Sequence, residues 1–214
     1  MKKSGIFISF EGLDFAGKST QIELLTDRLK LLKLPVIIIR EPGGTTISER
    51  IRDILLDLNN SEMTDICELL LYSAARHQLI SQKIRKFLDK GTIVIADRFV
   101  DSTTAYQGYG RQLPMSFISQ LNQIVTEGLL PDITFFLDLS YKDMLARKKA
   151  RASGSDRLEI QGRLFFERIR DGYYEIAQQN NNRFKIIAAA KPVLPISEQI
   201  WEFVAALLPL KDKL

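Results

Sequence analysis

Short runs of apolar residues alternate along this chain with longer stretches in which apolar residues recur every three or four positions. The short runs are rich in β-branched and aromatic residues, which is typical of buried strands. They cover residues 5–10, 36–40, 92–96, 133–137 and 184–188. The longer stretches have the spacing of amphipathic helices. They cover residues 20–34, 65–90, 115–127, 141–152, 161–179 and about 196–208.

The order of these elements predicts the fold class. A strand is followed by helical sequence five times, which is typical of an α/β fold with a five-stranded parallel sheet and helices on both faces. No repeat, low-complexity tract or linker-like change in composition divides the 214 residues, so we expect a single domain spanning 1–214. Segments 41–46, 101–114 and 153–159 are expected to be loops, where binding residues often lie.

Composition excludes several classes of protein. Hydrophobic residues make up 45% and charged residues 26% of the chain, a balance that supports a packed core and excludes intrinsic disorder. The single cysteine cannot form an internal disulfide. The longest aliphatic run, 36–39, is far shorter than the roughly 20 residues of a membrane span. We therefore expect a soluble, cytoplasmic protein with no membrane partner.

Residues 12–19 match the pattern G-x-x-x-x-G-K-[ST] without exception. The match follows a predicted strand and opens a predicted helix, the context in which this pattern binds phosphate. The glycines allow successive backbone N–H groups to face one anion, and the helix N-terminus adds roughly half a positive charge. Lys18 supplies a full charge, and the Ser19 hydroxyl is placed to reach Mg²⁺. The residues predicted to bind ATP phosphates are Gly12, Leu13, Asp14, Phe15, Ala16, Gly17, Lys18, Ser19 and Thr20.

This phosphate-binding loop (P-loop) is shared by GTPases, motors and small-molecule kinases. A GTPase would need a guanine-reading N-K-x-D tetrapeptide, which the sequence lacks, and a motor core would usually need a longer chain. The length therefore favours a small kinase.

Acidic residues follow four of the predicted strands at or near their carboxyl ends: Glu11, Glu41, Asp97 and Asp138. Because the carboxyl ends of parallel strands share one edge of a sheet, we expect these side chains to point toward one crevice. Asp97 can serve with Ser19 as a ligand of Mg²⁺. Arg98 can hold an acceptor phosphate through its planar guanidinium.

Taken together, these motifs resemble the thymidylate kinase family of P-loop nucleoside monophosphate kinases. The resemblance runs from residue 5 to about residue 175. The motifs that carry it are Phe10-Glu11-Gly12-Leu13-Asp14 with the P-loop, Arg40-Glu41-Pro42-Gly43-Gly44-Thr45, Ala74-Ala75-Arg76, Asp97-Arg98-Phe99 and Ala105-Tyr106-Gln107-Gly108-Tyr109-Gly110-Arg111. The resemblance implies ATP-dependent phosphorylation of dTMP to dTDP with Mg²⁺ by a homodimer.

The resemblance also implies roles for single residues. Lys18 contacts the donor phosphates, and Arg98 grips the dTMP phosphate with Arg40 or Arg52 nearby. Arg76 donates to the thymine, Tyr72 stacks on it, and Tyr106 packs against the deoxyribose. The residues expected to bind dTMP are Asp14, Arg40, Pro42, Arg52, Tyr72, Arg76, Arg98, Thr103, Tyr106 and Gln107.

The sequence departs from the family pattern at two positions. Members commonly carry Phe where Tyr72 stands; a tyrosine can still stack on the base, but its hydroxyl needs a hydrogen-bond partner. Phe15 lies where some members carry an arginine inside the P-loop and others a glycine, the latter supplying the arginine from a mobile lid. Because Phe15 has no charge, we expect the lid, residues 147–159, to supply the catalytic arginine, with Arg151 as the leading candidate. Arg147, Lys148 and Arg157 support it.

Three alternatives stay open from the sequence. The first is a kinase of another nucleoside monophosphate, and the second is a nucleotide-binding regulator without activity, although such a protein would be expected to have lost Lys18, Asp97 or Arg98. The third is a nucleic-acid-binding module, suggested by the net charge of +4. Residues 147–157 hold five basic residues and one acidic residue, which accounts for the whole excess. That location fits a lid over nucleotide phosphates better, so we expect no nucleic-acid partner.

Replacing the lid arginine tests its assignment. Arg151→Ala should lower kcat by about 10²-fold or more, because an arginine finger stabilises the charge of the transferring phosphoryl group. Steady-state kinetics measures this, and an unchanged kcat would reject the assignment.

Overall fold

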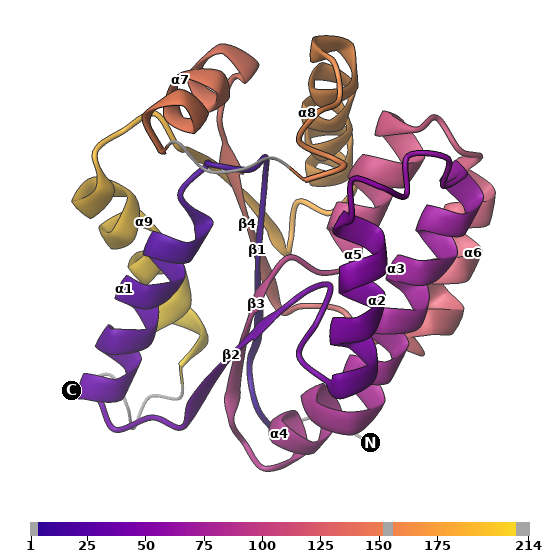
Figure 1. The fold of residues 1–214 in the computed structure, drawn as a ribbon. Helices are drawn as coiled ribbons and strands as arrows, with labels where there is room; N and C mark the ends of the chain where they lie inside the picture. The colour runs from indigo at the N-terminus through magenta and orange to yellow at the C-terminus, as the bar shows by residue number, and fades with distance from the viewer. Residues whose placement is uncertain (1–3, 152–155, 209–214) are drawn as a thin grey trace.

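A computed structural model describes residues 4–151 and 156–208, without the side chain of Arg151. Five parallel strands form one sheet in the order β2-β3-β1-β4-β5 (Figure 1). They are β1 (Phe7–Glu11), β2 (Val36–Arg40), β3 (Ile93–Asp97), β4 (Ile133–Asp138) and β5 (Phe184–Ala188). The predicted fold class is confirmed, and each predicted strand lies within two residues of its observed position.

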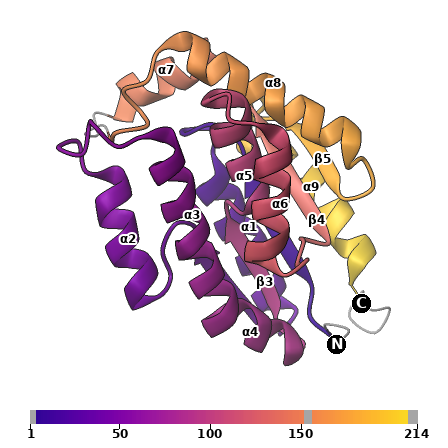
Figure 2. The same ribbon diagram turned by 90° about the vertical axis from the view of Figure 1, so that its right-hand side faces the viewer.

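Helices cover both faces of this sheet. On one side lie α1 (Lys18–Leu31) and α9 (Val193–Leu207); on the other lie α2 (Thr46–Leu56), α3 (Asp65–Leu79) and α6 (Met115–Thr126) (Figure 1). Figure 2 shows α2, α3 and α6 side by side, with α7 (Tyr141–Arg151) and α8 (Arg163–Gln179) above them. Because both faces are covered, β1 is buried along its whole length. No helix in the described residues is long and apolar enough to cross a membrane.

Segment 65–90 is helical throughout, as predicted, but not uniformly α-helical. A π-helical turn, η1 (Ile80–Ile84), separates α3 from α4 (Arg85–Asp89). Helix α2 was not predicted. Its start is marked by Thr45, whose hydroxyl accepts a hydrogen bond of 3.1 Å from the backbone N–H of Ser48, as an N-cap residue does.

The prediction of a loop over 101–114 is wrong. The chain forms α5 (Val100–Thr103) and then a π-helix, η2 (Thr104–Gly110), before α6. Glycines disfavour helices, but here they allow close packing: a Cβ on Gly110 would lie 2.8 Å from the Phe165 ring on α8. Tertiary packing against α8 therefore outweighs the local preference.

The strand order positions the site. From β1 the chain crosses to β2 at one edge of the sheet, and from β3 it crosses back over β1 to β4. The crevice between the carboxyl ends of β1 and β3 lies at the point where this direction changes, which is where ligands bind in open α/β sheets.

Candidate active site

The P-loop joins β1 to α1 through two glycines that have positive φ, 132° at Gly12 and 95° at Gly17. A side chain at Gly12 would collide with the chain of β4, because a Cβ there would lie 2.6 Å from the carbonyl oxygen of Leu137. Lys18 folds back over the loop, and its Nζ donates to the carbonyl oxygens of Gly12 (3.3 Å) and Leu13 (3.0 Å). Burial and the nearby Arg98 guanidinium lower the pKa of Lys18.

A cavity of about 400 Å³ opens beside this loop, and we call it the loop cavity. It is lined by Asp14, Phe15, Gly17, Lys18, Ser19, Thr20, Arg40, Glu41, Arg52, Asp97, Arg98, Arg147 and Glu159. Of the residues predicted to bind ATP phosphates, Gly12, Leu13 and Ala16 do not line it. Ser19 and Asp97, the predicted metal ligands, both do. The described residues hold no cluster of three or more His, Cys, Asp or Glu that would bind a metal by itself.

A second cavity, of about 90 Å³, adjoins the first, and we call it the side cavity. All of the residues predicted to bind dTMP line it except Arg40, which lines the loop cavity. Residues of the side cavity that sequence reasoning did not assign to it are Glu41, Leu56, Ser102, Asp156 and Leu158. The sequence could have indicated Glu41, because it follows the end of a predicted strand. Nothing in the sequence points to Leu56 or Leu158.

Arg98 lines both cavities. It has a positive φ of 71°, and its backbone N–H donates to the carbonyl oxygen of Phe10 at 2.9 Å. The guanidinium donates to the carbonyl oxygen of Gly12 at 2.8 Å and to the carboxylate of Asp14 at 2.7 Å. Burial would raise the pKa of Asp14, but Arg98 and Lys18 outweigh it and lower that pKa. Asp14 is therefore an ionised partner that holds Arg98 over the P-loop.

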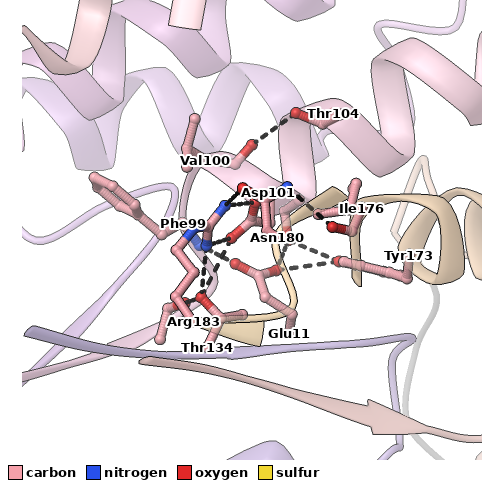
Figure 3. A network of polar contacts seen from close by, with 12 residues as sticks. Glu11, Phe99, Val100, Asp101, Thr104, Thr134, Tyr173, Ile176, Asn180 and Arg183 are labelled. Carbon is pink, nitrogen blue, oxygen red and sulfur yellow. Dashed lines mark hydrogen bonds and ion pairs between the residues drawn. The ribbon is translucent and has the colours of Figure 1, made fainter. Parts of the chain in front are cut away.

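The carboxylate of Glu11 is buried and lines neither cavity; Figure 3 shows its contacts. It accepts hydrogen bonds from the backbone N–H of Phe99 (2.7 Å) and from the hydroxyls of Ser102 and Tyr173. Burial and the nearby Asp101 raise the pKa of Glu11 to about 7. Glu11 thus holds the turn after β3 against β1. The expectation that it points into the crevice is wrong.

An ion pair beside Glu11 supports the same turn. The guanidinium of Arg183, next to β5, donates to both carboxylate oxygens of Asp101 at 2.7 and 2.8 Å (Figure 3). It also donates to the hydroxyl of Thr134 on β4. Side chains therefore tie helix α5 to β1, to β4 and to the residue that precedes β5.

Asp138, the fourth strand-end acid, does not line either cavity. Its carboxylate accepts two hydrogen bonds from Arg170 on α8, at 2.6 and 2.9 Å, and one from the hydroxyl of Tyr174 at 2.7 Å. The expectation that Asp138 faces the crevice is wrong, because its carboxylate pairs with Arg170 on α8 instead.

Arg76 is buried at the wall of the side cavity. Its Nε donates to Glu41 at 2.6 Å, its Nη1 to the hydroxyl of Thr103 at 2.7 Å and its Nη2 to the carbonyl oxygen of Phe99 at 3.1 Å. A guanidinium has five N–H donors, so one N–H on Nη1 and one on Nη2 remain for a ligand. These three contacts fix the plane of the group before any ligand arrives.

The lid residues separate into different environments. Arg147 lines the loop cavity, where it donates to the carbonyl oxygens of Phe15 (3.1 Å) and Ala189 (2.7 Å). Lys148 instead pairs with Glu159 at 3.0 Å, and Arg157 is buried against Glu68. The Arg151 side chain and residues 152–155 lie outside the described residues. The basic run therefore does not face the P-loop as one surface.

The sequence and the structure were compared with known proteins. The sequence model of the family described as Thymidylate kinase matches residues 10–200. A thymidylate kinase from Desulforudis audaxviator is 45% identical over 206 residues, which cover 96% of this chain and 92% of the relative. One from Symbiobacterium thermophilum is 43% identical over 204 residues, covering 95% of this chain and 94% of the relative. The crystal structure of thymidylate kinase from Ehrlichia chaffeensis superposes with a TM-score of 0.76 at 34% identity, covering 94% of this chain and 98% of that one.

The Arg76–Glu41 pair allows a test of stability. Arg76→Met should lower the free energy of unfolding by about 3–5 kcal/mol, because it leaves a buried carboxylate without its cation. Arg40→Met is the matched control; it removes an exposed pair with Glu49 and should cost at most about 1 kcal/mol. Urea unfolding measures the free energy of unfolding of both variants. Equal losses would contradict the interpretation of Arg76–Glu41 as a buried ion pair that stabilises the fold.

Proposed function

The chain belongs to the thymidylate kinase family, and on that premise we propose that it transfers the γ-phosphoryl group of ATP to dTMP, giving ADP and dTDP for nucleotide biosynthesis. The position of Arg98, which lines both cavities, supports this function most directly. One cation can thus contact the phosphate of a nucleotide in each. We also propose that the enzyme is cytoplasmic.

The loop cavity is the proposed ATP site. Lys18 exchanges its contacts with its own loop for the β- and γ-phosphates, and the backbone N–H groups of the P-loop bind the same oxygens. Ser19 and Asp97 would hold Mg²⁺ here. Two protein oxygens suit this ion, because Mg²⁺ usually takes the rest of its ligands from water and substrate phosphates. When bound, Mg²⁺ neutralises phosphate charge.

The side cavity is the proposed dTMP site. Arg98 holds the phosphate and keeps it in line with the donor, Asp14 lies near the sugar, and Tyr106 packs against the ribose face. Arg76 donates its remaining N–H groups to the base, with Tyr72 stacked on it. The lid closes this arrangement, Arg151 contacting the transferring group, since phosphoryl transfer needs positioning and charge neutralisation above all.

We propose that the enzyme is a homodimer that associates through the outer faces of α3 and α6, which lie side by side (Figure 2). Exposed apolar side chains gather there: Ile66, Leu70, Met115, Phe117 and Ile124. Ile124 is 72% exposed. Exposed apolar residues on neighbouring helices are typical of interaction sites, and a self-complementary surface on each of two copies gives a closed dimer.

Acceptor preference tests the proposed function. A coupled assay for ADP release, with ATP, Mg²⁺ and each of dTMP, dUMP, dCMP, dAMP and dGMP, should give the highest kcat/KM for dTMP. Lys18→Met should lower turnover by at least about 10²-fold, whereas Lys30→Met, a change on the exposed side of α1, should not. Preference for a purine nucleotide would contradict the dTMP assignment; ATP binding without dTMP-dependent turnover would favour a regulator.

The dimer proposal predicts that Leu70→Glu gives a monomer, because the charge would be buried in the interface without a partner. Leu31→Glu is the control; Leu31 is 84% exposed on α1, away from the proposed interface. Sedimentation equilibrium measures the mass of each variant. A wild-type monomer, or a Leu70→Glu dimer, would overturn the proposal.

A further inference from the structure

Glu68 on α3 is fully buried and lines neither the loop cavity nor the side cavity. Its carboxylate accepts hydrogen bonds from three residues, two of them in η2 or directly after it and one in the segment before α8. Gln107 Nε2 donates at 2.8 Å, Arg111 donates through Nε (3.2 Å) and Nη2 (2.9 Å), and Arg157 donates through Nη2. Arg157 also donates to the carbonyl oxygen of Leu55 at 3.0 Å. Two guanidiniums therefore share one carboxylate.

The two arginines keep Glu68 ionised. Burial alone would raise its pKa, but the hydrogen bonds from Arg111 and Gln107 and the charges of the two arginines outweigh burial and lower it. An ionised carboxylate only accepts hydrogen bonds. The amide of Gln107 must therefore turn its NH₂ group toward Glu68, because the opposite orientation would place two acceptors against each other.

This orientation decides what Gln107 offers to a ligand. Gln107 lines the side cavity, and among the described residues no donor contacts its side-chain carbonyl oxygen. With one N–H of the NH₂ group held by Glu68, the carbonyl oxygen is the acceptor that the amide leaves for a ligand. It is an acceptor, and it suits a ligand that brings an N–H donor.

We propose that Glu68 is a specificity-determining positioning residue, which holds the Gln107 amide so that its carbonyl oxygen accepts the N3–H of a thymine or uracil base. The inference rests on the proposed function. Thymine and uracil carry a hydrogen on N3, whereas N3 of cytosine is a bare acceptor that would face the carbonyl oxygen. A site built around a hydrogen bond rejects a ligand that leaves its polar group unpaired. Glu68 therefore excludes dCMP without contacting it.

Glu68→Gln removes the constraint with little change in shape. A glutamine at position 68 both donates and accepts, so Gln107 can turn either end toward it. Isothermal titration calorimetry gives the dissociation constants of dTMP, dUMP and dCMP, and their ratios do not depend on the folded fraction. We expect the preference for dTMP over dCMP to fall at least about 10-fold. The preference for dTMP over dUMP should stay within about 2-fold of wild type, since these bases differ only by a methyl group.

Asp138→Asn is the matched control, because Asp138 is also a carboxylate with a bidentate arginine partner but lies outside both cavities. It should leave both ratios unchanged. If Glu68→Gln does not fold, the double variant Glu68→Gln with Arg157→Gln removes both charges of this buried pair. The same three dissociation constants are then compared in the double variant.

The outcomes separate this inference from the proposed function. A wild-type enzyme that turns over dTMP, together with an unchanged dTMP-to-dCMP ratio in Glu68→Gln, overturns the role of Glu68 alone. Equal weakening of all three nucleotides also overturns it, because it indicates a merely structural role. A wild-type chain that neither binds nor phosphorylates dTMP overturns the proposed function.

Discussion

The left-handed turn at Arg98 is the constraint on which both cavities depend. A non-glycine residue with φ of 71° is strained by about 1–2 kcal/mol, and the surrounding contacts offset that cost. The backbone N–H of Arg98 bonds to β1, and Glu11 holds the next N–H from below. The turn directs the guanidinium back over the P-loop, where Asp14 holds it. Had the chain left β3 in an extended conformation, Arg98 would not line both cavities.

The sheet and the P-loop could be predicted because their signals are local. A strand covered on both faces is apolar throughout, and the P-loop pattern depends on glycines within eight residues of one another. Segment 101–114 could not be predicted, because its helical form depends on α8, with Phe165 lying against Gly110.

The candidate site, too, could be predicted from the sequence only in part. Most residues that line the cavities belong to recognisable motifs and were predicted from the P-loop pattern or by resemblance, whereas Leu56 and Leu158 have no such signal. The residues that support the cavities were not predicted, because they join segments far apart: Glu68 meets Arg157 across 89 positions, and Glu11 meets Phe99 across 88. The net charge of the lid illustrates the limit. The sequence places the excess of basic residues in 147–157, yet Arg157 and Lys148 are paired with acids, and Arg147 alone of the segment's described basic residues lines the loop cavity.

Both proposed nucleotide sites depend on Arg98, which would contact the phosphates of ATP and dTMP at once. Rapid-quench measurement of a single turnover tests this dependence most directly, with Arg98→Gln compared with Arg40→Gln, since Arg40 lines the loop cavity alone. We predict that Arg98→Gln slows phosphoryl transfer from saturating ATP and dTMP by about 10³-fold or more, and that Arg40→Gln has a much smaller effect. Transfer by Arg98→Gln within about 10-fold of the wild-type rate would show that Arg98 does not serve both nucleotides.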